Sequence, residues 1–344
     1  YKRQHRPEYI LQSTWSNPRT NKLLLEGGFT FYNERWIFGP EPYNVNGYGP
    51  DAVISKTESS LGITYGANNV FTTAYNHQYN MRAAANYVTG SHTIKVGVQN
   101  MWGTRQYSYD TNQAQAWTFS KGIPTTITQY ARPLIDLEKL KSALGIYAQD
   151  RWTLGHLTLN YGVRFDYHNA YVPAQTLAAI PFVAARQYDA ISNVPNWKDI
   201  TPRVGATYDI FGNGKTVARA NWGHYLASES TNMATLNNRV NTSVNSASRS
   251  WADANGNFVP DCTLTNTAAN GECGALNAPL GSLNIAARYA PEITSGWGVR
   301  PNDMEIAAGV QHEILPRVAL DFQFTHHAFG NFVASQNTAR PPSA

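Results

Sequence analysis

Apolar and polar residues alternate along several stretches of this chain. In the stretch His156–His168, six apolar side chains from Leu157 to Tyr167 occupy every second position, and polar residues that include Arg164 and Asp166 lie between them. Successive side chains of a β-strand point to opposite faces, so this stretch predicts a strand with one apolar and one polar face. A helix would instead repeat its apolar residues every three to four positions.

The alternating pattern recurs in ten stretches that pair into five predicted hairpins. Each pair is joined by a few residues that include Gly, Pro or Asn, which favour tight turns between antiparallel strands. The predicted pairs are Tyr9–Ser16 with Lys22–Asn33, Gln78–Val88 with Thr93–Tyr109, Ala143–Thr153 with His156–His168, Thr201–Ile210 with Thr216–Ala227, and Asp303–Ile314 with Val318–Phe329.

Strand length and loop placement indicate where such hairpins belong. The predicted strands have roughly 8–17 residues, whereas a globular strand has about 5–6 and a strand that crosses a bilayer needs about 9–11. The turns are short, but the links between hairpins are long, at about 34–77, 110–142, 170–200 and 228–302. This asymmetry is typical of outer-membrane barrels. We therefore predict an all-β fold, a transmembrane antiparallel β-barrel of about ten strands, with its apolar face toward lipid and its polar face toward an aqueous lumen.

The composition of the 344 residues agrees with this prediction. Only 15% are charged, against about 25% in a typical soluble domain, while 12% are aromatic and the mean hydropathy is −0.41. No stretch approaches the roughly 20 apolar residues of a membrane-spanning helix. A net charge of +4 without a block of like charges argues against a nucleic-acid partner. Aromatic residues near strand ends predict interfacial girdles: Trp102, Tyr147, Trp152, Tyr167, Trp222 and Tyr225.

Five segments together resemble a known family. The segments GIYAQDRWTLGHLTLNYGVRFDYH (145–168), TPRVGATYDIFGNGKTVARANWGHYLA (201–227) and NDMEIAAGVQHEILPRVALDFQFTHHAFGN (302–331) resemble the barrel of TonB-dependent outer-membrane receptors. More narrowly, they are similar to the Oar-like group, whose members carry a carboxypeptidase-regulatory-like domain. The segments 82–99 and 14–32 fit the same pattern, and the matching pieces cover roughly half of the chain.

The resemblance implies a receptor or transporter in the outer membrane of a Gram-negative bacterium. It also implies outer-membrane lipid, a plug domain and the TonB complex as partners, and an oligosaccharide, a peptide or a chelate as substrate. We find no plug or TonB-box-like segment, and the chain stops without a terminal aromatic strand. We therefore expect a portion of a larger barrel.

One long loop contains a candidate Ca²⁺ site. Oxygen-bearing groups stand at positions 1, 3, 5, 7 and 9 of the segment that starts at residue 253, which is the spacing of a Ca²⁺ loop. The predicted ligands are Asp253, Asn255, Asn257, the Val259 carbonyl and Asp261. Position 6 lacks the glycine of an EF-hand, and position 12 is Leu264 in place of glutamate. An exposed turn rich in Asn and Gly is the alternative.

The same loop holds the two cysteines of the chain, Cys262 and Cys273. An even number of cysteines in an exported protein predicts a disulfide, and the alternative is a pair of free thiols. Closing a loop of this size contributes about 3 kcal/mol in the chain-entropy model. We expect the bridge to hold the loop together more than the barrel.

Polar residues on the predicted strands form a candidate lumen-facing set. Mixed charges on such a face form a cross-strand lattice that supports the wall, or contact a substrate or a plug. The predicted set is Asn160, Arg164, Asp166, Arg203, Asp209, Arg219, Asn221, Glu305, Gln311, Asp321 and Gln323.

Two other functions remain open alongside a receptor barrel. We find no Gly-x-Ser-x-Gly or His-Glu-x-x-His motif, so the sequence predicts no catalytic residue. A closed ten-stranded barrel could nevertheless carry a hydrolytic site at its loop rim, with an Asp/His or Ser/His cluster there. A soluble surface protein with Ca²⁺-ordered loops is the other alternative.

Overall fold

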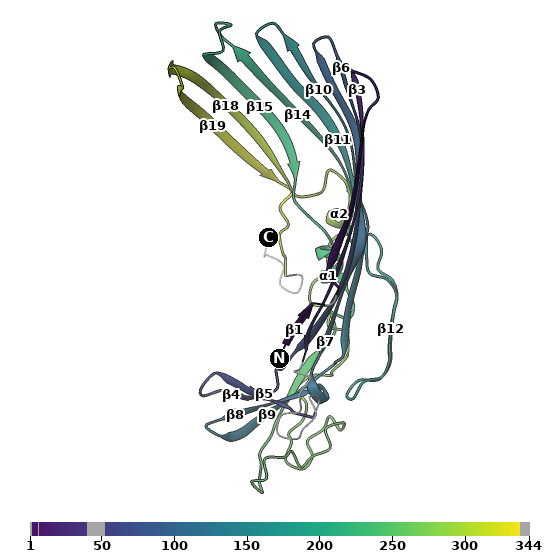
Figure 1. Ribbon diagram of the computed structural model, residues 1–344. Helices are drawn as coiled ribbons and strands as arrows, with labels where there is room; N and C mark the ends of the chain where they lie inside the picture. The colour runs from purple at the N-terminus through teal and green to yellow at the C-terminus, as the bar shows by residue number, and fades with distance from the viewer. Residues whose placement is uncertain (1, 6, 40–51, 338–344) are drawn as a thin grey trace.

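The computed structural model of the chain describes residues 2–5, 7–39 and 52–337. Its dominant feature is one large sheet that curves into an open trough (Figure 1). Ten long antiparallel strands follow one another across the sheet in chain order. They are β2 (Tyr9–Pro18), β3 (Leu23–Gly39), β6 (Phe71–Thr89), β7 (His92–Asp110), β10 (Leu134–Leu154), β11 (Leu157–Tyr171), β14 (Asn196–Asp209), β15 (Thr216–Leu226), β18 (Asn302–Leu315) and β19 (Val318–Gly330).

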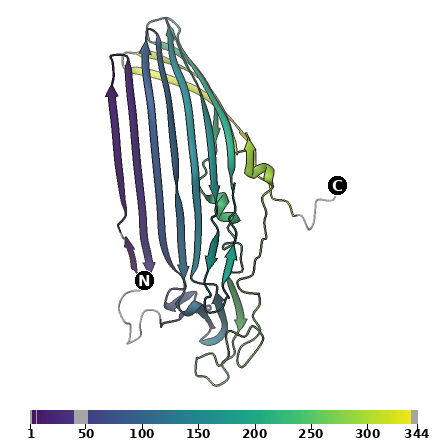
Figure 2. The same cartoon turned by 90° about the vertical axis from the view of Figure 1, so that its right-hand side faces the viewer.

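All five predicted hairpins are confirmed, because each predicted pair of strands is hydrogen-bonded along its length. The tight turns lie together at one end of the trough, seen at the top of Figure 2. Gly90 and Gly155 have φ of +55° and +56°, the left-handed conformation that two-residue hairpin turns require. Over the described residues β2 and β19 do not pair with each other, so the sheet is open.

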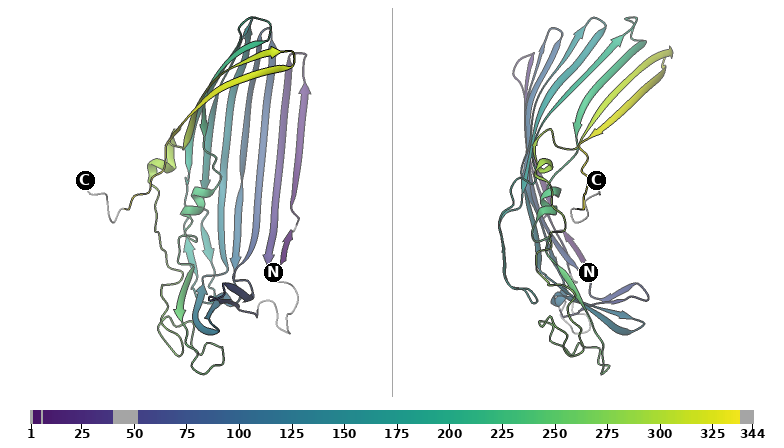
Figure 3. Two further views of the ribbon diagram at one scale, coloured as in Figure 1. Left: turned by 90° about the vertical axis from the view of Figure 1, so that its left-hand side faces the viewer. Right: turned by 180° about the vertical axis from the view of Figure 1, so that it is seen from behind.

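The two faces of the sheet separate by polarity, as the alternation predicts. The cross-strand register places Val98, Ile146, Phe165 and Ile200 in one row, and Ile146 and Ile200 are 48% and 55% exposed. Apolar side chains that no other part of the protein covers are suited to contact with lipid. The register places charged residues such as Arg164 and Arg203 on the opposite face. This face is the concave side of the trough, where the helices lie (Figure 3).

Two rows of aromatic rings mark the limits of the apolar band. At the turn end, the rings of His92 and Trp152 stack 5.3 Å apart. Toward the loop end, Trp102 stacks on Tyr79 at 5.5 Å, and Tyr79 stacks on Phe31 at 4.8 Å. His92 and Trp102 are ten positions apart on β7, which corresponds to about 25 Å for a tilted strand. This height equals the hydrocarbon band of an outer-membrane barrel.

Two of the predicted girdle residues are wrong. Tyr147 and Tyr225 lie on the concave face, because Tyr147 pairs with Gly97 and Arg164 and because the ring of Tyr225 lies 4.4 Å from the Arg203 guanidinium carbon. The register places Trp102, Trp152, Tyr167 and Trp222 on the convex face. Parity along the strand decides the face, whereas nearness to a strand end does not.

The strands are longer than the sequence indicated, so the predicted loops were drawn too wide. Positions 34–39, 71–77, 134–142 and 196–200 were assigned to loops but are strand. Beyond the aromatic row the strands no longer need apolar side chains, because water and loops cover them, and the alternation fades. Cross-strand polar bonds hold them there, for example from Asn76 Nδ2 to Glu34 Oε2 at 2.6 Å. Residues 40–51 of the first predicted loop lie outside the described residues.

The long loops contain a second sheet that the sequence did not predict. Its five strands, in spatial order, are β16 (Ser246–Ser250), β9 (Ile123–Tyr130), β8 (Gln115–Ser120), β4 (Ser55–Glu58) and β5 (Ile63–Gly66). We call it the loop sheet, and it projects from the loop end of the trough (Figure 1). A small core of Phe119, Ile127, Trp251 and Cys273 packs on it.

The remaining elements are short. They are β1 (Lys2–His5), the 3₁₀ turn η1 (Asn112–Ala114), β12 (Gln175–Leu177), β13 (Arg186–Tyr188), α1 (Asn232–Asn237), α2 (Pro291–Thr294) and β17 (Ser295–Trp297). Strand β1 pairs with β3, and β17 runs parallel to β14. Of the helices in the described ranges, none has the length and apolar character to cross a membrane.

Candidate functional site

The concave face of the sheet brings together the predicted lumen-facing residues. The register places all eleven on this one face, spread over β11, β14, β15, β18 and β19. For example, Asn160 and Asn221 both pair with Gly205, and Arg203 and Glu305 both pair with Gly223. The polar set is therefore one continuous surface.

Part of this surface is a cross-strand lattice. Arg219 Nη2 donates to both carboxylate oxygens of Asp321, at 2.7 and 2.6 Å, and to Gln323 Oε1 at 3.1 Å. A second bond of this surface lies within one strand, since Arg164 Nε donates to Asp166 Oδ1 at 2.7 Å and both residues belong to β11. Asp209 instead accepts the backbone N–H groups of the adjacent hairpin turn, from Gly212 at 3.0 Å and Gly214 at 2.7 Å. Asp209 therefore closes a turn.

A buried ionic cluster toward the loop end was missed by the sequence analysis. Arg105 Nη1 donates to Asp136 Oδ2 and to Glu138 Oε2, both at 2.7 Å. The two carboxyl side chains are 3% and 0% exposed. Asn238 Nδ2 donates to Glu138 Oε1 at 2.9 Å, and Asn241 Nδ2 donates to Asp136 Oδ1 at 2.6 Å. We call these five residues the loop latch, because they join the loop after β15 to strands β7 and β10.

The two carboxyl groups of the loop latch have divergent pKa values. Both lie beyond the aromatic row and outside the membrane-spanning part of β10. Burial raises the pKa of Glu138 to about 8, and its hydrogen bond with Asp136 adds to the rise. Burial also acts to raise the pKa of Asp136, but the bonds from Glu138 and Arg105 outweigh it and lower that pKa. At neutral pH Glu138 therefore holds a proton beside an ionised Asp136.

A hydrophobic cluster next to the loop latch keeps the same loop inside the trough. Met233 and Ala234 of α1 pack against Leu140, Ala170 and Trp197, which project from the concave face. The loop therefore covers part of the concave face. The sequence signal for this contact was weak, since the six-residue helix α1 lies in a stretch without a clear period.

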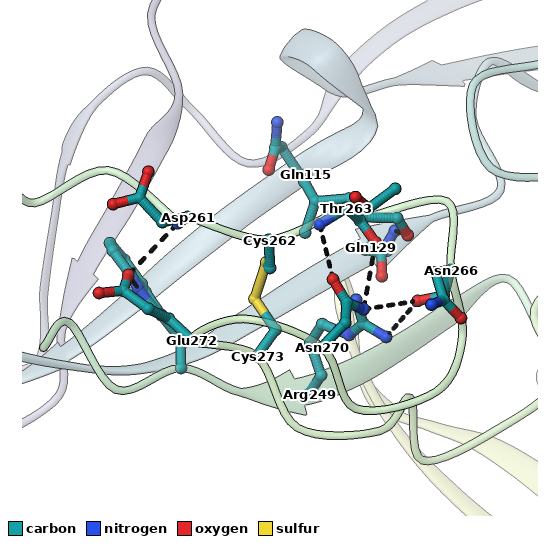
Figure 4. Close-up of a disulfide and its surroundings, with 12 residues drawn as sticks. Gln115, Gln129, Arg249, Asp261, Cys262, Thr263, Asn266, Asn270, Glu272 and Cys273 are labelled. Atoms are coloured by element: carbon teal, nitrogen blue, oxygen red, sulfur yellow. Dashed lines mark hydrogen bonds between the residues drawn. A yellow bond between two sulfur atoms is a disulfide. The ribbon is translucent and has the colours of Figure 1, made fainter.

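The predicted Cys262–Cys273 disulfide is present, with Cα atoms 5.9 Å apart (Figure 4). Arg249, which is 2% exposed, reaches the loop closed by the bridge, and its Nη2 donates to the Asn266 carbonyl at 2.7 Å. Gln129 Nε2 donates to the Leu264 carbonyl at 2.9 Å. The bridge closes the loop itself, as the sequence led us to expect, and these two side chains hold the loop against the loop sheet.

The residues of the candidate Ca²⁺ loop lie close together but bond to one another. Both carboxylate oxygens of Asp253 accept backbone N–H groups, at 2.9 Å from Gly256 and 3.0 Å from Phe258. Asn255 and Asn257 donate their amides to Asp261 Oδ2, at 2.6 and 2.9 Å. No group of three His, Cys, Asp or Glu residues in the described part of the chain has metal-binding geometry. Ca²⁺ binding by this loop stays a prediction.

An Asp/His pair lies at the loop end of the last hairpin. The His327 Nδ1 atom lies 2.8 Å from Asp303 Oδ2, and its Nε2 atom lies 4.0 Å from Glu305 Oε2. The enzyme alternative requires an Asp/His or Ser/His cluster at the loop rim, and this pair is such a cluster. It also requires a closed barrel, whereas the first and last long strands do not pair over the described residues.

Glu58 joins two turns of the loop sheet. Its Oε1 accepts from Ser60 N at 3.0 Å, from the Ser60 hydroxyl and from Lys121 N at 2.9 Å, and its Oε2 accepts from Gly122 N at 2.9 Å. The Ser60 hydroxyl bond, followed by the Gly122 N–H bond, lowers the pKa of Glu58 to about 2. The ionised carboxylate thus ties the β4–β5 turn to the β8–β9 turn.

The Glu58→Gln substitution is expected to separate these two turns at neutral pH. A glutamine amide presents N–H groups where Gly122 N–H needs an acceptor, so hydrogen exchange at Lys121 and Gly122 accelerates. Because the folded pKa lies below the ordinary value of 4.5, the wild type keeps this stabilisation above pH 4.5 and loses it as the pH falls toward 2. Exchange mass spectrometry on residues 115–130 and near-ultraviolet circular dichroism during acid titration check both parts.

The Ser60→Ala variant is the matched control, since it removes one hydroxyl donor and keeps the carboxylate. It should accelerate exchange less than Glu58→Gln. Equal exchange at residues 121 and 122 in the wild type and in Glu58→Gln would contradict the role of the carboxylate.

The chain was compared with known proteins at the level of sequence. A family model described as "Outer membrane beta barrel domain" matches residues 11–328. The chain is also similar to the TonB-dependent transporter Oar of Myxococcus xanthus, with 24% identity over 230 residues. The alignment covers 62% of this chain and 20% of the relative, so it spans about a fifth of that protein's length.

The chain is also similar in fold to a solved structure with a TM-score above 0.5. The crystal structure of the outer membrane transporter YddB from Escherichia coli matches with a TM-score of 0.52 and 14% identity, over 94% of this chain and 34% of that chain. The copper transporter OprC matches with a TM-score of 0.46 and 12% identity, over 94% of this chain and 39% of that chain. At this identity the likeness to YddB concerns the fold alone.

Proposed function

Because the chain belongs to the family of outer-membrane β-barrel domains, we propose that it builds part of the wall of a receptor that imports a solute. It lies in the bacterial outer membrane, with the convex face toward lipid. The tight turns then face the periplasm, and the loop sheet and the disulfide loop face the cell exterior. Capture of the solute by these loops precedes its passage along the concave face.

The observation that carries this proposal is the separation of the two faces over a band of membrane height. Each long strand has lipid-compatible side chains on one face and a hydrogen-bonded polar surface on the other, between aromatic rows ten positions apart. In a soluble protein, the convex row of Val98, Ile146 and Phe165 would be exposed to water. The apolar convex face and the family together argue against the soluble alternative.

The energy source and the partners are part of the same proposal. The relative in Myxococcus xanthus is a TonB-dependent transporter, which supports a plug domain and the TonB complex as partners of this barrel. An oligosaccharide, a peptide or a chelate remains the expected substrate class. The Gram-negative host follows from the same resemblance.

Uptake measurements in the native host test the proposal. Cells with and without the gene would receive a labelled oligosaccharide mixture, a labelled peptide mixture and metal chelates, each with and without a proton uncoupler. We expect one class to accumulate in wild-type cells and to fail to accumulate after gene deletion or uncoupling. Equal accumulation of all three classes in both strains would refute an import function, and uptake that resists the uncoupler would refute TonB dependence.

A further inference from the structure

Four cations project from the concave face on four adjacent strands. They are Lys95 on β7, Arg151 on β10, Arg164 on β11 and Arg203 on β14, and we call them the basic patch. Lys95 and Arg203 lie at the two ends of one row of paired residues that crosses the four strands. The two residues between them in this row are Gln149 and Gly162. Three strand spacings separate Lys95 from Arg203, which is about 14 Å.

The basic patch has few acidic neighbours within the described residues. Arg164 is paired with Asp166, and the Lys95 amine lies 3.8 Å from Glu26 Oε2. Arg203 contacts the Tyr225 ring, and neither Arg203 nor Arg151 has a carboxylate within 4.0 Å. Both of these arginines are exposed. The patch thus carries cations that no internal carboxylate neutralises.

Asp150 is the chain neighbour of Arg151 on β10, but it projects from the convex face, where its Oδ2 lies 2.6 Å from His92 Nδ1. Two further acids lie away from the patch. Asp199 is 2% exposed and sits toward the loop end of β14, and Asp209 bonds to the turn that follows it.

One acid of the neighbouring wall approaches the patch, because Glu305 on β18 pairs with Gly223, the residue that also pairs with Arg203. Asp303 on the same strand lies 2.8 Å from His327 Nδ1. Positive potential is therefore concentrated on strands β7 to β14.

The wall is hollowed beside these cations. A cavity of about 650 Å³ is lined by all four members of the basic patch together with Asn160, Asn221, the single concave-face acid Glu305 and other residues. Glycines at inward positions make this room, because a Cβ at Gly162 would meet Gln149 and a Cβ at Gly205 would meet Asn221. The hollow has both polar and apolar walls and is large enough for a small organic ligand.

We propose that the basic patch binds an anionic solute with two or more carboxylate or phosphate groups. Separate anionic groups of one ligand engage cations on different strands, which a monovalent anion cannot do. This inference rests on the proposed import function, and it narrows the substrate to an anionic class. Attraction across a water-filled lumen depends on ionic strength, so binding weakens as salt rises.

Calorimetry with the hexacarboxylate mellitate, on the full-length protein in detergent, tests the inference. We expect the wild type to bind mellitate at low ionic strength and to bind it more tightly than inorganic phosphate. The double variant Arg151→Glu/Arg203→Glu should weaken binding by about tenfold or more, since attraction becomes repulsion. The Arg151→Gln/Arg203→Gln variant should bind mellitate with an affinity between those of the wild type and of the charge-reversed variant. It tests the inference even if charge reversal prevents folding.

Lys215→Glu is the matched control, because it reverses one cation in the tight turn between β14 and β15, away from the hollow. It should bind mellitate like the wild type. Absence of mellitate binding by the wild type, or unchanged binding by the Arg151→Gln/Arg203→Gln variant, would overturn the inference. Either result leaves the import function to its own uptake test, since a barrel can import an uncharged solute.

Discussion

Replacing Arg105 by leucine is expected to release the loop after β15 from the concave face. The guanidinium donates to two carboxyl groups whose side chains are 3% and 0% exposed, so its loss leaves them buried without their cation. Breaking such a buried ionic group from one side costs about 3–5 kcal/mol. Hydrogen exchange at Thr235 and Val240, whose amides bond within this loop, should then accelerate by roughly two orders of magnitude or more.

The same latch predicts a dependence on pH. Because the folded state raises the pKa of Glu138 to about 8, it holds that proton more tightly than the open loop does. Docking therefore weakens as the pH rises from the ordinary Glu138 value of 4.5 to about 8, while the lowered pKa of Asp136 weakens docking as the pH falls below its ordinary value of 3.8. Glu138→Gln keeps a neutral partner for Asp136, so it should preserve docking at pH 7 and remove the loss of docking between about pH 4.5 and 8.

The Arg105→Leu and Glu138→Gln variants together test whether the loop latch holds the loop and which group causes the pH dependence. If Arg105→Leu changes exchange at Thr235 by less than tenfold, the loop latch does not hold the loop. If Glu138→Gln still loses protection as the pH rises from about 4.5 to 8, a group other than Glu138 is responsible for the pH dependence.

Placing a charge on the convex face is expected to produce the other large effect. Ile146 lies opposite Val98, between the two aromatic rows, and it is 48% exposed to the surroundings of the barrel. An arginine on the lipid face near the bilayer midplane costs about 2–4 kcal/mol. The free energy of unfolding of Ile146→Arg, measured by denaturant titration in phospholipid vesicles, should fall by this amount.

Gln149→Arg is the matched control on the same strand. Its side chain lies on the concave face, where water covers it, so its free energy of unfolding should stay within about 0.5 kcal/mol of the wild type. Equal losses for Ile146→Arg and Gln149→Arg would mean that the convex face does not meet lipid.

The hairpins could be predicted from the sequence because their signals are local. Alternation over a bilayer-spanning strand requires no knowledge of distant residues, and a turn such as Leu154-Gly155 follows from local backbone preferences. The same rule would have assigned Tyr147 to the concave face, since it stands one position from Ile146. Closeness to a strand end does not decide which face a side chain occupies, so it does not identify a girdle residue.

The loop sheet could not be predicted in the same way. Strands β4 and β5 have four residues each, too short for an alternating pattern to emerge. Strand β16 joins β9 from more than a hundred positions along the chain, with Arg249 opposite Ile127. Pairing at that separation depends on the path of two long loops.

The sequence by itself determined the antiparallel hairpins, the polarity of their two faces and the end at which the long loops gather, because each follows from neighbouring residues. Only the tertiary structure decided which charges meet. Arg105 comes from β7, Asp136 and Glu138 from β10, and Asn238 from a loop a hundred positions further on. The basic patch likewise exists only once four strands are in register. Electrostatic and packing contacts act through space, so the order of residues along the chain does not record them.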